Sequence, residues 1–225
     1  MDWRELIENN RAWVAERIQN DPGYFGRLAA KHEPHFLWLG CSDARVPANV
    51  VTGSDSGEMF VHRNIANQVH ATDANLAAVV QYAVEALDVH DIIVVGHEDC
   101  GGVRAALGPQ APPAVEHWIS QVRALARLHA DELEQIPDMD RRIARLVKLN
   151  VIEQVHNLAR LPVVQAAWAR NRELRVHGWV YNVHDGLLRD LQVSMDGRPA
   201  VEASAASRPS RREAPARTPE LRATG

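Results

Sequence analysis

Two short apolar segments constrain the fold of this chain more than any other feature. They are Phe36–Leu39 and Ile92–Val95, and each is followed by a glycine and then by polar residues. Short uninterrupted apolar runs bounded by glycine are typical of strands whose two faces are both covered. Between them, Glu58–Asn64 is predicted to be a strand, and a helix with an apolar stripe is predicted to begin after Asp73. Strand, helix and strand in succession predict a βαβ unit, and therefore a parallel sheet with a right-handed crossover.

The rest of the chain supplies helices to flank this sheet and further strands to extend it. Helical or alternating spacing predicts helices over Val115–Glu134, Met139–Leu158 and Pro162–Ala169, and strands over Leu174–Val183 and Leu187–Val193. Two helices separated by Asp21-Pro22-Gly23 precede the first strand, and they must cover either the chain's own sheet or a partner subunit. The predicted fold class is α/β, a mostly parallel central β-sheet flanked by helices, with an N-terminal helical arm.

Length and composition indicate one domain followed by a tail. Residues 1–195 of the 225 form the predicted domain, and residues 196–225 form a disordered tail rich in Ala, Ser, Pro and Arg. The 25 basic and 29 acidic side chains nearly balance, which argues against nucleic acid or a membrane surface as the main partner. The amino end has no export signal pattern, and no apolar stretch approaches the roughly 20 residues of a membrane helix. We therefore expect a cytoplasmic protein with reduced cysteines.

The chain has only two cysteines, and both follow predicted buried strands. Cys41 comes after the first apolar run, and His97 and Cys100 come after the second. Because ligands gather at the carboxyl ends of parallel strands, these three side chains are expected at one edge of the sheet. Two thiolates and one imidazole suit Zn²⁺ and leave a fourth position open for water, as in catalytic zinc sites. The alternative is that both cysteines are inert core residues.

A carboxylate and a guanidinium follow the first cysteine closely. Asp43 and Arg45 lie two and four residues beyond Cys41, near enough to approach the same metal. An Asp–Arg pair on its own is usually a weak surface contact. Beside a metal, however, Arg45 would keep Asp43 ionised and away from the fourth position.

These motifs together resemble the beta class of carbonic anhydrases. The resemblance rests on Cys41-Ser42-Asp43-x-Arg45 and Gly96-His97-x-x-Cys100-Gly101-Gly102, and it extends through Phe60–Asn64, Val80–Ala83 and His177–Tyr181. It implies a zinc lyase (carbonate dehydratase) that hydrates carbon dioxide reversibly to bicarbonate and a proton. The zinc would be held by Cys41, His97 and Cys100, and a zinc-bound hydroxide would attack the carbon. Asp43 would orient this hydroxide, and Arg45 would orient Asp43. Because two thiolates neutralise the charge of the zinc, its bound water is expected to be less acidic than in an all-histidine site. Activity is therefore expected to rise on the alkaline side.

The resemblance also implies regulation by bicarbonate and assembly into oligomers. Trp38, Arg63 and Tyr181 match a bicarbonate pocket found in one, type II-like, subgroup of the family. In that subgroup bicarbonate or low pH breaks the Asp–Arg pair, and the aspartate, here Asp43, becomes the fourth zinc ligand. Gly101 and Gly102 are expected near the substrate cavity. Family members form homodimers or homotetramers with the active site at the dimer interface.

One residue departs from the family pattern. His32 stands nine residues before the first zinc cysteine, where the family usually has a glutamine at the substrate cavity. An imidazole can donate a similar hydrogen bond, but it also titrates.

Other functions remain open at this point. The alternatives are a carbon disulfide or carbonyl sulfide hydrolase on the same scaffold, a non-catalytic zinc protein with Asp43 as permanent fourth ligand, and an enzyme with Cys41 as nucleophile. Zinc content would separate the last of these from the others.

Overall fold

A five-stranded sheet forms the centre of the molecule. The computed structural model describes residues 2–197, so all but the first two residues of the predicted tail lie outside the described part of the chain. The strands are β1 Phe36–Cys41, β2 Met59–Asn64, β3 Asp91–His97, β4 Arg175–Tyr181 and β5 Leu188–Asp190, in the spatial order β2-β1-β3-β4-β5. The first four strands are parallel and β5 pairs antiparallel with β4. The predicted α/β class with a mostly parallel sheet is confirmed.

Helices precede, connect and follow these strands. They are α1 Trp3–Asn20, α2 Tyr24–Ala30, α3 Ala48–Thr52, the 3-10 turn η1 Ile65–Asn67, α4 Ala74–Gln81 with its π-helical continuation η2 Tyr82–Ala86, α5 Gly101–Leu107, α6 Pro113–Trp118, α7 Ser120–Leu128, α8 Ala130–Glu134, α9 Met139–Ala159 and α10 Pro162–Ala169. Asp73 caps α4 by accepting hydrogen bonds from the backbone N–H groups of Asn75 and Leu76, as the sequence predicts. Among the described residues, no helix combines the length and the hydropathy that crossing a membrane requires.

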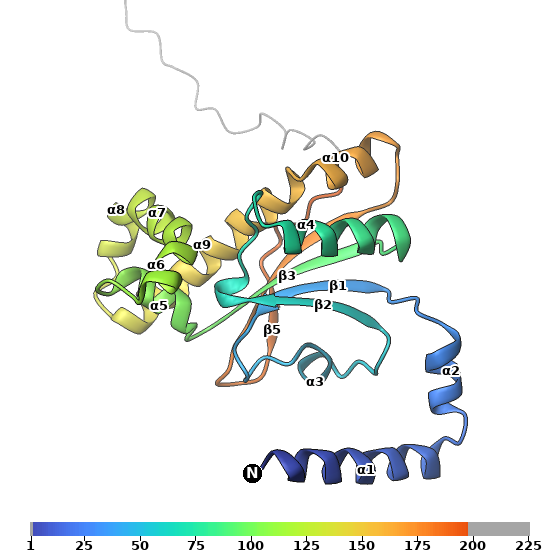
Figure 1. The fold of residues 1–225 in the computed structure, drawn as a ribbon. Coiled ribbons are helices and arrows are strands. Elements are labelled where there is room, and N and C mark those ends of the chain that lie inside the picture. Colours follow the sequence, from blue (N-terminus) through green and yellow to red (C-terminus); the bar gives the residue numbers. More distant parts are fainter. Residues whose placement is uncertain (1, 198–225) are drawn as a thin grey trace, which may run out of the picture.

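The alternation of side chains along β1 and β3 divides the interior into two unequal parts. Leu37, Leu39, Ile92 and Val94 point into the large cluster that α4, α9 and α10 cover, on one side of the sheet (Figure 1). Trp38, Ile93 and Val95 point to the opposite face, into a smaller cluster with Val46 and Ala48 at α3. Burial on both faces explains why these strands are continuously apolar in sequence.

Two predicted elements differ from the observed ones. The helix predicted over Val115–Glu134 is broken after Trp118 and Leu128 into α6, α7 and α8, and at the first break Ser120 Oγ donates a hydrogen bond to the carbonyl oxygen of His117. Serine competes with the helical hydrogen-bonding pattern in this way. The strand predicted over Leu187–Val193 ends at Asp190, because Gln192 adopts φ 57° and its N–H bonds the Asp190 carboxylate.

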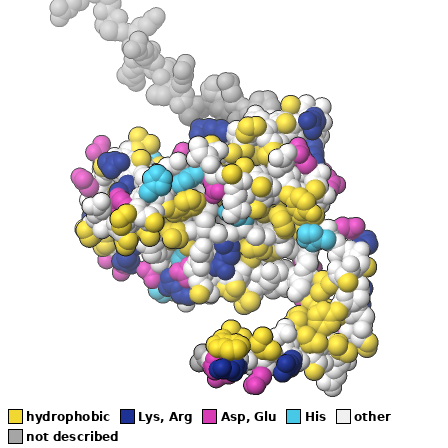
Figure 2. Space-filling view, viewed as in Figure 1, with side chains coloured by type: hydrophobic (Ala, Val, Ile, Leu, Met, Phe, Trp, Pro, Cys, Tyr) yellow, Lys and Arg dark blue, Asp and Glu magenta, His cyan; other side chains and the backbone are white. Residues whose placement is uncertain are grey.

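The N-terminal arm extends away from the sheet. In the described chain none of the residues of α1 is buried, and Figure 1 shows α1 standing apart from the strands, joined to them through α2. Trp3, Leu6 and Ile7 are more than half exposed, and apolar side chains gather along the arm in Figure 2. The structure therefore excludes the first of the two alternatives for α1, that it covers the chain's own sheet.

Candidate metal centre

The carboxyl ends of two adjacent strands position the first two candidate ligands. Cys41 is the last residue of β1 and His97 the last residue of β3, and these strands pair in parallel. Cys100 follows three residues later, at the N-cap of α5. All three side chains are buried. The parallel sheet thus brings together residues that are 59 positions apart in sequence.

The spacing of these three side chains fits a tetrahedral metal ion. The sulfurs of Cys41 and Cys100 lie 3.9 Å apart, and both lie within 4.8 Å of a ring nitrogen of His97. Zinc–sulfur bonds of about 2.3 Å at a tetrahedral angle place two sulfurs about 3.8 Å apart. The two sulfurs are therefore already at the separation that a bound zinc ion requires.

The ring of His97 presents the nitrogen that a metal requires. Its Nδ1 lies 2.9 Å from the carbonyl oxygen of Glu98, and a carbonyl can only accept, so Nδ1 carries the proton. Nε2 is then an unprotonated acceptor, and among residues 2–197 this buried atom has no hydrogen-bond partner. A backbone carbonyl that fixes the tautomer is the usual support of a metal-bound histidine.

The two thiol groups influence each other's ionisation through their mutual contact. A hydrogen bond from Cys100 lowers the pKa of Cys41 to about 4, assisted by His97 and by backbone groups and opposed by burial. The same contact, together with burial and the neighbouring negative charge, raises the pKa of Cys100. A divalent cation would neutralise the negative charge of both sulfurs as thiolates. The donor chemistry therefore fits zinc as well as the spacing does.

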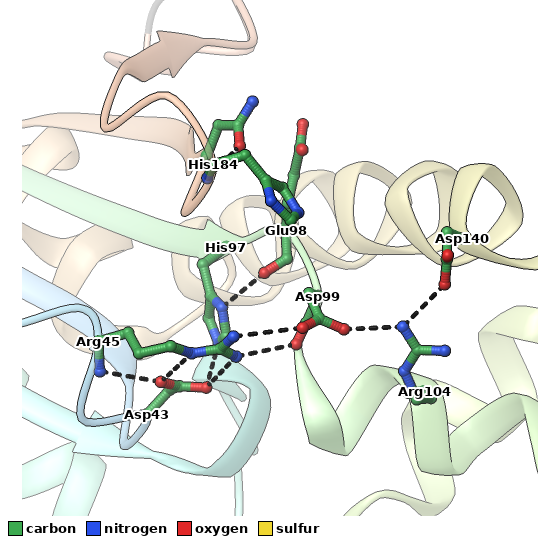
Figure 3. Close-up of polar contacts among 9 residues, drawn as sticks. Asp43, Arg45, His97, Glu98, Asp99, Arg104, Asp140 and His184 are labelled. Carbon is green, nitrogen blue, oxygen red and sulfur yellow. Dashed lines mark hydrogen bonds and ion pairs between the residues drawn. The ribbon is translucent and has the colours of Figure 1, made fainter.

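Asp43 faces the three ligands and is held by Arg45. The Asp43 Oδ1 atom accepts hydrogen bonds from Nε and the backbone N–H of Arg45, and Oδ2 accepts one from Nη2 at 2.7 Å (Figure 3). These hydrogen bonds hold the pKa of Asp43 far below its usual range although burial opposes them. The Oδ2 atom also lies 3.7 Å from His97 Nε2. An ionised carboxylate therefore borders the metal position while bound to a guanidinium.

Comparison with known proteins agrees with this geometry. Residues 36–188 match the carbonic anhydrase family. The chain belongs to the beta-class carbonic anhydrases. A carbonic anhydrase of Emericella nidulans is 47% identical, covering 86% of this chain and 85% of its own length. A tetrameric beta-carbonic anhydrase of Sordaria macrospora superimposes with a TM-score of 0.83 at 34% identity, covering 86% of this chain and 98% of its own. A Coccomyxa beta-carbonic anhydrase, solved with acetazolamide, gives 0.83 at 37% identity, covering 87% and 89%.

The family assignment establishes the activity and the cofactor. The chain is a carbonate dehydratase, a lyase, whose substrates are carbon dioxide and bicarbonate. Cys41, His97 and Cys100 are the cysteine–histidine–cysteine set of its zinc site. The predicted carbonic anhydrase activity and the predicted zinc cofactor are confirmed.

The three residues predicted to bind bicarbonate lie on three parallel strands, Trp38 on β1, Arg63 on β2 and Tyr181 on β4. Trp38 and Tyr181 belong to the smaller cluster on the α3 face. Arg63 pairs with Gly40 across β2 and β1, and its guanidinium donates to the carbonyl oxygens of Cys41 and Asp43. Trp38 is fully buried, yet its Nε1 has no hydrogen-bond partner in the described structure.

The remaining predicted residues lie in different surroundings. Gly102 packs against η1, where an added Cβ would come within 2.7 Å of Ile65, whereas Gly101 begins α5 beside Cys100. His32 lies against the ring of Phe60, with centroids 6.0 Å apart, near the amino end of β2. Within this chain His32 is thus at the opposite end of the sheet from the zinc ligands. Its place in the substrate cavity stays a prediction.

One carboxylate beside the site was not predicted from sequence. Asp99, next to Cys100, contacts Arg45 through both its side chain and its backbone carbonyl. Its position within the His97–Cys100 motif was the available signal, but a lone acidic residue in a loop does not indicate a partner. The fold reveals the partner by bringing the β1 and β3 loops together.

Proposed function

We propose that Asp43 and Arg45 act together beside zinc in the hydration of carbon dioxide, and that bicarbonate regulates the enzyme by separating them. Bound zinc supplies a nucleophile near neutral pH by lowering the pKa of water. The observation that carries the proposal is the position of Asp43 Oδ2, which faces His97 Nε2 at 3.7 Å while Arg45 binds it from the other side.

The two carboxylate oxygens of Asp43 have different roles. Two hydrogen bonds from Arg45 occupy Oδ1, whereas Oδ2 receives a single one and keeps a lone pair toward the ligands. Because its pKa is depressed, Asp43 is an acceptor only, and Oδ2 can fix the orientation of a water by accepting its hydrogen. Arg45 fixes the carboxylate in turn, and this keeps a potential fourth ligand away from the metal.

Replacing the carboxylate of Asp43 tests this role directly. An amide in Asp43→Asn keeps the shape but weakens the acceptor and the ion pair, so we expect kcat/KM to fall by about two orders of magnitude. Zinc content should be unchanged, since the three ligands remain. Stopped-flow hydration assays and zinc analysis of the same preparations measure both. A fully active variant with full zinc occupancy would contradict the proposed role.

The geometry around Arg63 supports regulation by an anion. The Arg63 guanidinium holds the loop of Asp43 through two backbone carbonyls, and a bicarbonate ion is a stronger acceptor than either of them. Trp38 Nε1 is a buried donor without a partner among the described residues, and such groups are costly unless something satisfies them. An anion bound by Trp38 and Arg63 would free the loop, and Asp43 could then take the fourth zinc position.

The position of the Trp38 indole requires a glycine at position 40. An added Cβ at Gly40 would meet the Trp38 indole at 2.2 Å from Nε1. Any other residue at this position would displace the ring. Glycine here therefore keeps the indole N–H directed at the proposed pocket.

Trp38→Phe tests the regulatory proposal, with Trp179→Phe as its matched control in the same apolar cluster. Phenylalanine preserves most of the packing but lacks the donor. We expect Trp38→Phe to keep its activity without bicarbonate and to need about tenfold more bicarbonate for half-inhibition at mildly acid pH, which corresponds to about 1.4 kcal/mol. Trp179→Phe should behave like the parent. If the parent activity were flat from mildly acid to alkaline pH and insensitive to bicarbonate, the proposed switch would be wrong.

The exposed arm supports assembly into homodimers or homotetramers. An 18-residue helix whose apolar side chains are exposed, Trp3 at 65% and Leu6 at 56% among them, gains little stability unless another surface covers it. The Sordaria macrospora relative is tetrameric. We expect light scattering to show a multimer, and expect deletion of residues 2–20 to reduce its order. A monomeric parent protein would contradict the proposal.

A further inference from the structure

The guanidinium of Arg45 is held from two sides. On one side it binds Asp43, and on the other Nη1 donates to Asp99 Oδ2 at 3.2 Å and Nη2 donates to the Asp99 carbonyl oxygen at 3.1 Å (Figure 3). Asp43 and Asp99 together thus use the Nε, Nη1 and Nη2 atoms of Arg45. A guanidinium bound along two edges cannot rotate without losing contacts on both.

The conformation of Asp99 directs both of its acceptors at Arg45. Its φ of 55° is in the left-handed region, which is uncommon for residues other than glycine and is tolerated best by Asn and Asp. The same residue immediately precedes Cys100. The turn that delivers a zinc ligand is therefore also the turn that holds Arg45.

Asp99 is itself fixed by a second arginine. Arg104 of α5 donates to Asp99 Oδ1 at 2.7 Å and to Asp140 Oδ1, at the start of α9, at 2.9 Å. A cavity of about 350 Å³ lined by these three side chains opens beside the contact, so water competes for each group. Isolated exposed ion pairs contribute little. Here, however, carboxylate and guanidinium groups alternate from Asp43 to Asp140, so each partner is held by the next.

We infer that Asp99 is a positioning residue of the active site, which holds Arg45 in the plane where it binds Asp43 and so keeps Asp43 off the zinc. This inference rests on the proposed role of Asp43 and Arg45. Without the Asp99 carboxylate, the half-exposed Arg45 keeps its contacts to Asp43 but loses its anchor on α5 and α9. The pair then opens more often, which lowers activity and increases sensitivity to bicarbonate.

Asp99→Asn and Asp99→Gly test the inference, because both residues tolerate the positive φ. Asp88 is a matched control, since it also has a positive φ of 57° and also binds an arginine, Arg172, but lies outside the site. We expect Asp99→Gly to lower kcat/KM five- to tenfold and to lower the bicarbonate concentration for half-inhibition by a similar factor, with Asp99→Asn in between. Asp88→Asn and Asp88→Gly should stay within twofold of the parent in both measurements.

Two further measurements separate positioning from a general structural role. In ¹⁵N relaxation experiments on the zinc enzyme, the Nε–H of Arg45 should become more mobile in Asp99→Gly and stay rigid in Asp88→Gly. In the cobalt(II)-substituted enzyme, the visible spectrum should shift toward carboxylate ligation at a lower bicarbonate concentration in Asp99→Gly. An unchanged Arg45 signal and unchanged bicarbonate sensitivity in Asp99→Gly would overturn the inference. The proposed function is tested separately, because full activity in Arg45→Ala would contradict it.

Discussion

The two ends of the sheet carry nearly the same three side chains, and only one end is a zinc site. At the carboxyl end, Arg45 binds the two carboxylate oxygens of Asp43 through Nε and Nη2, near His97. At the amino end, Arg175 binds the two carboxylate oxygens of Asp91 through Nε and Nη2, at 2.8 and 3.1 Å, near His177. The exposure of these groups is also alike, with 19% and 17% for the aspartate side chains and 49% and 48% for the arginines.

The histidines account for the difference. Both ring nitrogens of His177 are engaged, Nε2 with Asp91 at 3.0 Å and Nδ1 with Ser194 Oγ at 2.8 Å. His97 engages only Nδ1 and directs Nε2 at two buried sulfurs. An Asp–Arg–His cluster is therefore not a catalytic site in itself. A free, buried ring nitrogen and a pair of thiols turn such a cluster into a metal site.

The largest expected effect comes from removing each histidine. His97→Ala takes away a zinc ligand, so we expect loss of most bound zinc and of carbon dioxide hydration. His177→Ala should keep zinc and activity and lose about 1–3 kcal/mol of stability, because it leaves polar partners unsatisfied. Zinc analysis and urea unfolding of both variants check this. If His177→Ala also lost its zinc, the two clusters would not be independent.

A smaller effect is expected when each arginine is replaced by lysine. Lysine keeps the charge but lacks the planar pair of N–H groups with which arginine binds both oxygens of a carboxylate. Arg45→Lys should lower kcat/KM by about ten- to a hundredfold at full zinc occupancy, equivalent to about 1.4–2.7 kcal/mol. Arg175→Lys should leave kcat/KM within about twofold of the parent, because it touches no zinc ligand. Equal losses in the two variants would mean that Arg45 contributes only stability.

The strand ends of the site were predictable, whereas its polar surroundings were not. Apolar runs bounded by glycine located β1 and β3, and the rule for parallel sheets placed Cys41, His97 and Cys100 at one edge. The contact of Asp99 with Arg45 joins loops 54 positions apart, and no local pattern encodes such a pairing. The amino-end cluster was missed for the same reason, since Asp91 meets His177 only through the β3–β4 register.

The surroundings of the N-terminal arm could not be predicted from the sequence either. Its helices were predicted from spacing and from the break at Asp21-Pro22-Gly23, and the structure places them at Trp3–Asn20 and Tyr24–Ala30. What covers an exposed amphipathic helix depends on a surface that the chain's own pattern does not describe. The break after Trp118 depends likewise on a local side-chain hydrogen bond, that of Ser120, which the apolar spacing ignores.

The smallest expected effect concerns stability and its dependence on pH. Burial alone would raise the pKa of Asp91, but hydrogen bonds from His177 and Arg175 outweigh it and lower the pKa. A carboxyl group with a depressed folded-state pKa stabilises the fold above its unfolded pKa of about 3.9, and this contribution is lost as the pH falls through the folded value. Asp91→Asn should therefore lower stability by about 1 kcal/mol at pH 7, or Tm by roughly 2–4 °C.

The difference between parent and Asp91→Asn should stay constant down to about pH 5 and narrow below about pH 4, where the carboxyl group of the unfolded parent becomes protonated. Urea unfolding of both proteins from pH 7 to pH 3.5 measures it, and carbon dioxide hydration at neutral pH should be unchanged. Asp43→Asn is the matched comparison, because Asp43 has the same kind of partner and a pKa shifted in the same direction. Asp43→Asn should reduce activity at every pH, whereas a loss of activity in Asp91→Asn would show that the amino-end cluster influences the zinc site through β3.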